Sequence, residues 1–314
     1  MQTKLTGWKA NLLSMAGRVI LTQAVTSVIL SYVMLGIMLP AKILNSIDRV
    51  NRNFIWGSSD IKKKLHLVSW RKITRPKTKG GLGIMAAKPK NLALAAKLCW
   101  RFKSKPNALW AKVLGCKYLS GARPRKHAYS KTWSTIRKGE DICTLGSRWL
   151  IGSNCTLNFW FDKRLTSGAL KGLIFGPLNL GEELLCINNI YEDGIWHLYR
   201  LYFVIPYHLE ILIKATPIRR NSVGGNELIW NSTIDGNFNS KEAYLLALGS
   251  NSENYVFSHH WNWKLNILPR IQIMLWKCAH LNLPVRNVLL RRKIIMDLLC
   301  KICKESDETI LRVF

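Results

Sequence analysis

The sequence is poor in acidic residues. Asp and Glu together number 18 in 314 residues, against 47 Lys and Arg, so the formal net charge at pH 7 is +29. Basic side chains displace condensed counterions from phosphates, so this excess predicts a polyanionic partner, most simply RNA or DNA. No small-molecule substrate is expected. A basic surface without a specific partner is the alternative interpretation.

The sequence also lacks the dense cysteine framework of a small secreted domain. Six of its eight Cys are isolated in apolar or mixed surroundings, which predicts a reducing compartment and ordinary small core residues. The remaining two, Cys300 and Cys303, form a C-x-x-C pair, which is half of a zinc site because both thiolates can point at one ion.

Charge is missing altogether between Val19 and Ala41. The stretch from residue 19 to 39 has enough residues to cross a bilayer as a helix, so membrane association is one alternative. Polar residues spaced along one helix face, including Thr22, Gln23 and Thr26, favour a buried helix instead. The absence of acidic residues before Asp48 also resembles the composition of an organellar transit peptide.

The most concentrated basic segment runs from Lys62 to Gly83. Trp70 lies among its cations, and this combination suits a phosphate backbone next to an unstacked base; Trp56 is a second candidate for base stacking. The G-G-L-G run that ends the segment lacks the features of a phosphate-binding loop and predicts a turn. The candidate nucleic-acid-binding residues are Lys62, Lys63, Lys64, Trp70, Arg71, Lys72, Arg75, Lys77, Lys79, Arg291 and Arg292.

Hydrophobic periodicity predicts a mostly α protein with small β-hairpins, an α+β or irregular α class. Pro269 and Pro284 suit the first turns of two short C-terminal helices. The other expected elements are a helix capped by Ser14 or Asn11 and interrupted by Pro40, helices over 41–56, 91–102, 107–118 and 195–203, a short strand over 66–70, hairpins over 148–162 and 228–238, and a short helix capped by Ser240.

Several of these segments, in order, resemble plant LINE-type non-LTR retrotransposon reverse transcriptase polyproteins. The segments are G-W-K-A-N-L-L-S-M-A-G-R from Gly7, F-I-W-G from Phe54, P-K-T-K-G-G-L-G from Pro76, N-L-A-L-A-A-K-L-C-W-R-F from Asn91 and L-N-F-W-F-D before residue 163. From about Trp230 the chain resembles the reverse-transcriptase zinc-binding domain. The resemblance implies a thumb-like helical region over 1–120, a connector over 121–225 and a truncated zinc-binding-like domain over 226–314.

Two features of that family are missing. Its polymerase site contains adjacent Asp residues, and this sequence has no Asp-Asp pair; the nearest look-alike, at Tyr191 to Gly194, is interpreted as a solvated turn. After the C-x-x-C, the family's His position holds Arg312, and the chain ends before a further Cys. The C-x-x-C pair is therefore expected without bound metal. The alternative is zinc at an incomplete site, which His259, His260, Cys278 or His280 would have to complete as substitute ligands.

The functional prediction is a non-catalytic, nucleic-acid-binding fragment of a retrotransposon protein. RNA-directed DNA polymerase activity is the alternative that the family label carries, and a non-functional pseudogene product is another. The basic runs near Lys62 and Arg291 favour a nuclear location, with a cytoplasmic one as the alternative.

Overall fold

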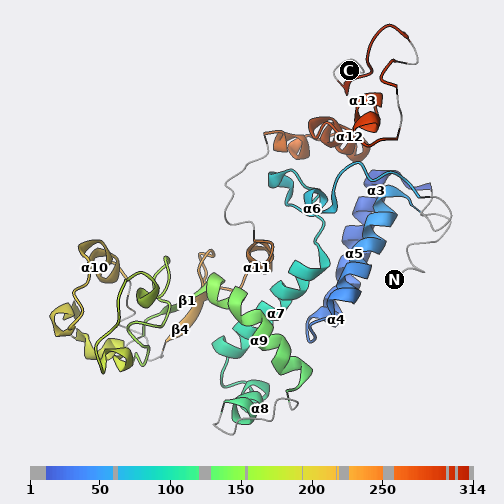
Figure 1. Ribbon diagram of the computed structural model, residues 1–314. Coiled ribbons are helices and arrows are strands. Elements are labelled where there is room, and N and C mark those ends of the chain that lie inside the picture. Colours follow the sequence, from blue (N-terminus) through green and yellow to red (C-terminus); the bar gives the residue numbers. More distant parts are fainter. Residues whose placement is uncertain are drawn as a thin grey trace. The chain divides into compact units, whose positions relative to one another are not determined.

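Helices dominate the computed structural model (Figure 1). It describes residues 12–58, 63–119, 129–152, 155–192, 194–216, 218, 226–249, 258–294, 297–300 and 303–310. Within these ranges the strands form two antiparallel two-stranded sheets. The expected class, mostly α with small β elements, is confirmed.

The chain folds into two compact units. Unit 1 comprises residues 1–34, 39–90 and 251–314, and unit 2 comprises 35–38 and 91–250. The first and last parts of the chain thus share one unit. The division into 1–120, 121–225 and 226–314 stays a prediction about domain boundaries.

The described part of unit 1 includes an apolar helical stretch near its N-terminal side. Helix α3 (Met15–Leu21) starts at Ser14, whose hydroxyl accepts a hydrogen bond from the Gly17 N–H. It continues through the π-helical turn η1 (Thr22–Thr26) into α4 (Ser27–Met34). By length and composition the 20 residues from Met15 to Met34 could cross a membrane, and 28% of the apolar 18-residue window within them is buried.

Helix α5 (Ala41–Trp56) is amphipathic and ends at Gly57, whose φ of +69° makes it a left-handed cap. Its apolar side joins a core shared by segments from both ends of the chain. The C-terminal contribution comes from η8 (His260–Lys264), α12 (Pro269–Ala279) and α13 (Arg286–Arg291). The buried members of this core are Ala16, Val19, Ile55, Trp56, Leu67, Val68, Ile73, Leu82, Ile84, Ile273 and Trp276.

The expected strand over 66–70 is wrong. Residues 66–69 are irregular, and Trp70 begins the short helix α6 (Trp70–Ile73), followed by the 3-10 turn η2 (Lys77–Lys79). Leu67 and Val68 are buried because they pack in the helical core and not because they pair with a neighbouring strand. Apolar runs this short do not distinguish the two arrangements.

In unit 2, α7 (Ala87–Ser104), which starts in unit 1, packs with α9 (Lys131–Gly146), and α8 (Leu109–Tyr118) lies between them in the chain. Helix α9 was not expected from the sequence. Gly139 permits a close approach, because a Cβ atom there would lie 2.3 Å from the backbone carbon of Ala95. The side chain of Ser130 caps α9 by accepting from the Trp133 N–H at 3.2 Å.

The hairpin expected over 148–162 is wrong. Strand β1 (Ser147–Leu150) pairs antiparallel with β4 (Glu227–Trp230), far along the chain. The second half of the supposed hairpin instead supplies the fully buried Phe159 and Trp160 to a separate core. The hairpin over 228–238 is also wrong as a strand pair, although its turn forms: the Trp230 N–H bonds the Gly236 carbonyl at 2.7 Å.

The core around Phe159 includes Leu170 of the short turn η3 (Leu170–Gly172) and Ile187 of η5 (Ile187–Asn189), and η4 (Glu182–Leu184) lies between these turns in the chain. The helix expected over 195–203 is wrong. Strands β2 (Tyr191–Glu192) and β3 (Ile195–Trp196) pair there, then η6 (Leu198–Arg200) follows, and α10 (Tyr207–Lys214) comes later. Helix α11 (Ser240–Ala247) forms as expected, but Asn239 caps it.

Candidate nucleic-acid interface and half metal site

Backbone hydrogen bonds close the basic segment of unit 1 into a loop. The described part of this segment, residues 63–83, is called the basic loop below. The Leu82 N–H bonds the Ile73 carbonyl, and the Gly81 N–H bonds the Pro76 carbonyl, each at 2.9 Å. A Cβ atom on Gly81 would lie 1.8 Å from the carbonyl oxygen of Arg75, so no larger residue fits there. The G-G-L-G run is therefore a tight turn, as expected.

Side chains from the C-terminal helices hold this loop in place. The carbonyl oxygen of Gly80 accepts from the indole N–H of Trp276 at 2.8 Å and lies 2.7 Å from Nε2 of His280. On the other side, the amide of Gln23 donates to the Leu82 carbonyl at 3.0 Å. The loop thus rests on both ends of the chain.

The two basic regions singled out in the sequence meet in unit 1. The Arg292 guanidinium donates to the carbonyl oxygen of His66 at 2.8 Å and also to that of Leu67. A guanidinium can share its donors between backbone acceptors and a further ligand, because it has five N–H groups. Arg292 therefore lies beside the basic loop and helps to position it.

The candidate residues differ in exposure. Trp70 is half-buried and packs against the core of unit 1, and Trp56 is buried and stacks on the His66 ring with centroids 5.8 Å apart. Lys77 lies with its amine 4.7 Å from the centre of the Trp263 ring. Lys62 lies outside the described residues. Exposed candidates are Lys63, Lys64, Arg71, Lys72, Lys77, Arg291 and Arg292, and Arg75 and Lys79 are half-buried.

This placement favours contacts with phosphates over base stacking at these positions. The exposed cations surround the loop, whereas both Trp side chains use ring surface in the core. The assignment of these residues to nucleic-acid binding stays a prediction.

The C-x-x-C pair occupies a hydrogen-bonded turn after α13. The Cys300 N–H bonds the Ser306 carbonyl, and the Lys304 N–H bonds the Cys300 carbonyl, each at 2.9 Å. Leu299 and Asp307 form an antiparallel bridge that closes the turn. Cys300 and Cys303 thus both lie between the two residues of this bridge, within one short closed loop.

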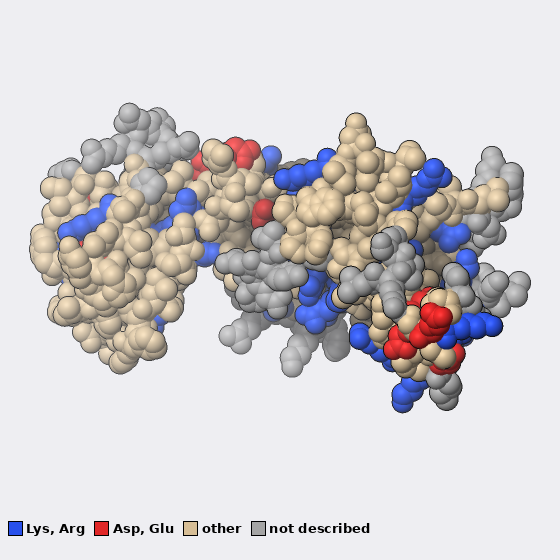
Figure 2. Space-filling model, turned by 90° about the horizontal axis from the view of Figure 1, so that it is seen from above, with Lys and Arg blue, Asp and Glu red and all other residues tan. Residues whose placement is uncertain are grey.

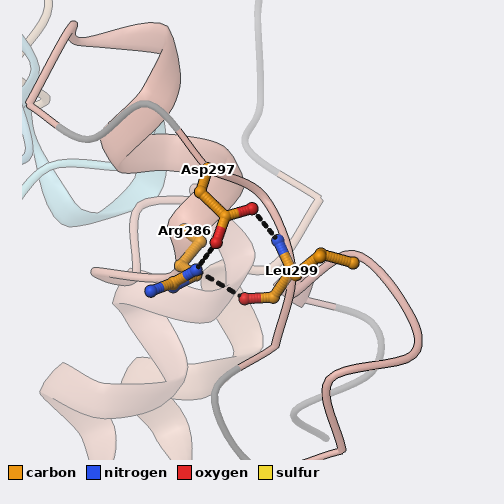
Figure 3. A network of polar contacts seen from close by, with 3 residues as sticks. All are labelled: Arg286, Asp297 and Leu299. Atoms are coloured by element: carbon orange, nitrogen blue, oxygen red, sulfur yellow. Dashed lines mark hydrogen bonds and ion pairs between the residues drawn. The ribbon is translucent and has the colours of Figure 1, made fainter.

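A network of three residues ties this turn to α13 (Figure 3). The Arg286 guanidinium pairs with the Asp297 carboxylate at 2.6 Å and donates to the Leu299 carbonyl at 2.7 Å. The Asp297 carboxylate also accepts from the Leu299 N–H at 2.9 Å, which together with Arg286 lowers the pKa of its carboxyl. These bonds fix the chain immediately before Cys300.

The chemistry of the pair fits half of a zinc site. The Glu305 N–H and the Ser306 hydroxyl, whose oxygen lies 3.6 Å from the sulfur, lower the pKa of the Cys303 thiol to about 7. The thiolate is the form that binds zinc. Among the described residues, however, no group of three or more His, Cys, Asp or Glu could hold a metal.

Two of the four residues that the sequence suggested as substitute zinc ligands form hydrogen bonds with other groups. His280 bonds to the Gly80 carbonyl, and Nδ1 of His259 bonds the Ser258 hydroxyl at 2.9 Å. Cys278 and His259 line a mostly apolar hollow of about 340 Å³. Cys300 and Cys303 would hold a zinc ion by two thiolates, and the described part of the chain does not complete the set.

Sequence reasoning missed a second polar constellation in unit 1. Lys90 and Asn51 are buried, at 8% and 3% exposure, and they line a hollow next to the end of the basic loop. The only signal in the sequence was a lysine and an asparagine within predominantly apolar helix faces, which is weak because such residues usually point to solvent.

Comparison with known proteins identifies the C-terminal region. Residues 238–314 match the family described as zinc-binding in reverse transcriptase. The chain is 30% identical over 321 residues to a "Putative ribonuclease H protein" of Arabidopsis thaliana, an alignment that covers 99% of this chain and 52% of the relative. It is also 29% identical over 120 residues to an uncharacterized mitochondrial protein of the same plant, covering 35% of this chain and 75% of that protein.

The chain spans about half the length of the first of these relatives, and no solved structure matches it significantly. The matched region contains both Cys300 and Cys303 and the helices that hold the basic loop. The resemblance to a retrotransposon protein is thus confirmed, and it is carried most specifically by residues 238–314, which match the reverse-transcriptase zinc-binding family.

Proposed function

We propose that this chain is the nucleic-acid-binding part of a LINE-type retroelement protein, and that it binds RNA or DNA through phosphates without catalysing a reaction. The observation that carries the proposal is the convergence of the two basic regions, marked by the bonds from Arg292 to the carbonyls of His66 and Leu67. Its family and its ribonuclease-H-named relative support a nucleic acid as the partner.

The charge distribution supports the same partner. Unit 1 holds 26 of the 47 Lys and Arg and only 7 of the 18 Asp and Glu. Figure 2 shows Lys and Arg side chains spread over the visible face, with Asp and Glu gathered in a few places. Cations spread over a surface suit a flexible polyanion, because each phosphate contact releases counterions.

A salt titration tests the proposal. We expect the protein to bind single-stranded RNA at micromolar or lower concentration in low salt, with an affinity that falls steeply as salt rises. Replacing Lys63, Lys64 and Lys72 by Gln should reduce the slope of log K against log salt by about 2, at roughly 0.7 per lost phosphate contact. No binding at low salt would refute the proposal.

A matched control distinguishes the effect of lysines in the basic loop from the effect of net charge alone. Lys112, Lys138 and Lys241 are exposed lysines of unit 2, and their replacement by Gln removes the same net charge. We expect the control to change the slope less than the variant in the basic loop. Equal changes would mean that the loop has no special role.

Catalysis is tested separately. The absence of an Asp-Asp pair motivates the expectation that a primer-extension assay with Mg²⁺ gives no incorporation above background. Incorporation would establish the polymerase alternative.

If the apolar stretch Met15–Met34 anchors the protein in a membrane, carbonate extraction will leave the protein in the membrane pellet. We expect carbonate to release it.

The nucleus is the location that the proposed partner favours, and fluorescence of the tagged chain in plant cells tests it.

A pseudogene product with no stable fold is the remaining alternative. It is contradicted by a cooperative thermal transition, which we expect from the packed cores of both units.

A further inference from the structure

Unit 1 contains a partly enclosed hollow of about 180 Å³ that none of the functions above uses. It lies between η1, α5 and the start of α7, beside the segment that follows the basic loop. Its lining includes no Asp or Glu. The residues that line it are Thr22, Gln23, Thr26, Ser27, Leu30, Ile47, Asn51, Gly83, Ile84, Met85, Ala87 and Lys90.

The helix that forms one wall is irregular at this point. Thr22 and Thr26 are buried, at 1% exposure each, and their hydroxyls donate to the carbonyls of Arg18 and Thr22 at 2.8 and 2.6 Å. Each hydroxyl oxygen retains the capacity to accept a hydrogen bond. Single π-helical turns of this kind inside α-helices frequently occur at functional sites.

Two buried polar side chains in the hollow, Lys90 and Asn51, lack part of the charge or hydrogen-bond complement that such groups usually have. The Lys90 amine donates to the carbonyl and hydroxyl oxygens of Ser27, and the hollow offers it no carboxylate. The side-chain oxygen of Asn51 is buried and accepts no hydrogen bond from the described residues. A ligand that fills the hollow would therefore present an acceptor to Lys90 and a donor to Asn51.

We propose that this hollow receives one unstacked nucleobase of a bound single strand. The edge of every nucleobase carries both donors and acceptors, as Lys90 and Asn51 require. Its flat faces suit the apolar walls supplied by Leu30, Ile47 and Ile84. This inference rests on the proposed function, because the phosphates on either side of that base would contact the basic loop.

The hollow is continuous with that loop. Gly83 lines the hollow, and a Cβ atom on it would lie 3.6 Å from Cγ of Lys77. Lys77 is exposed, its aliphatic chain lies beside Gly83, and its amine lies 4.7 Å from the centre of the Trp263 ring. A strand held by Lys77 through a phosphate could thus place its neighbouring base in the hollow.

The test compares two probes with the same number of phosphates: oligo(U), and the same oligonucleotide with every base removed. We expect the wild-type chain to bind the base-bearing probe at least about fivefold more tightly, the lower limit for one well-held base. Lys90→Met should reduce this ratio severalfold. Lys88→Met is the matched control, because Lys88 is exposed on the same helix; it should weaken both probes alike and leave the ratio unchanged.

The outcomes separate the two proposals. Failure of both probes to bind at low salt refutes nucleic-acid binding itself. Equal binding of both probes by the wild-type chain, or a ratio that Lys90→Met does not alter, overturns the base site alone.

A footprint on the wild-type chain makes the test independent of any variant's folding. Mild acetylation followed by mass spectrometry should show that oligo(U) protects Lys90 and that the probe without bases does not. Lys88 should be protected to the same extent by both. Equal protection of Lys90 by the two probes would contradict the inference.

Discussion

The guanidinium of Arg292 donates a hydrogen bond to the backbone carbonyl of His66 at 2.8 Å, across 226 positions of sequence. The bond joins the C-terminal helices to the basic loop that follows α5. Trp276 makes a second such connection to Gly80. The basic loop of unit 1 thus depends on residues of the zinc-binding family region for its conformation.

Arg292→Gln should lower the free energy of unfolding by roughly 1–3 kcal/mol, because two backbone carbonyls lose a charged donor. Arg291→Gln removes the same charge from an exposed neighbour and should change the free energy of unfolding by less than about 0.5 kcal/mol. Urea denaturation of both variants measures the difference. Indistinguishable midpoints would show that the connection contributes little.

Gly139→Ala should destabilise unit 2 by roughly 1–3 kcal/mol, because the new methyl group meets the backbone of Ala95. Gly115 lies within α8, and a Cβ atom there meets nothing within 4 Å. Gly115→Ala should therefore stabilise by roughly 0.5–1 kcal/mol through helix propensity. Thermal melting of the pair checks the opposite signs, and a stabilising Gly139→Ala would show that α7 and α9 pack less closely.

Local patterns predicted several helices, including α5 and α12, but missed α9 and α10 and failed at long-range strand pairing. The amphipathic spacing over 41–56 and the proline at 269 mark α5 and α12 correctly, because helix signals lie within a few turns of sequence. The partner of β1 is β4, and nothing near residue 150 indicates it. An apolar run after a Gly-Ser-Asn turn resembles a hairpin whether it pairs or enters a core, as Phe159 and Trp160 do.

The candidate site was predictable in part for the same reason. The sequence revealed the basic segment and the C-x-x-C because these are contiguous. It could not reveal that Arg292 contacts His66, or that Lys90 and Asn51 share a hollow, since these relations exist only after folding. Helix α9 was missed although Ser130, Trp133 and Ile136 have the spacing of a capped amphipathic helix.

Cys303 should react with iodoacetamide increasingly as pH rises through about 7, where its thiol ionises. Ser306→Ala removes a hydroxyl close to the sulfur, so the midpoint should move to higher pH. Mass spectrometry of the alkylated peptides follows both. Cys155 is the internal control: burial raises the pKa of its thiol, so it should stay unmodified in the folded protein, and equal labelling of both would indicate unfolding.

Zinc should bind weakly to the reduced chain, because the described residues offer two thiolates where a structural site uses four ligands. After dialysis against a chelator we expect well under one equivalent, measured by plasma mass spectrometry. Replacing Cys300 and Cys303 by Ser should abolish the remainder. A stoichiometric ion that survives dialysis would mean that other residues complete the site.

Lys90 should make stability depend on pH in the alkaline range. Burial lowers the pKa of its amine from 10.5 to about 8 in the folded protein. Below about pH 8 the amine is protonated in both states, and burying the charge opposes folding in full. Between about 8 and 10.5 the unfolded chain binds more protons than the folded chain, so stability rises with pH.

The free energy of unfolding of the wild-type chain, relative to Lys90→Met, should therefore increase from pH 7 to pH 10 in denaturant titrations. Lys163 and Lys277, whose pKa values burial also lowers, are common to both proteins and cancel in the difference. The Asp48 carboxyl, which accepts a hydrogen bond from the Ala87 N–H at 2.9 Å and whose pKa burial raises, is likewise common to both proteins. Since a bound base would supply an acceptor to the charged amine, adding oligo(U) should flatten the pH dependence, whereas the probe without bases should leave it steep.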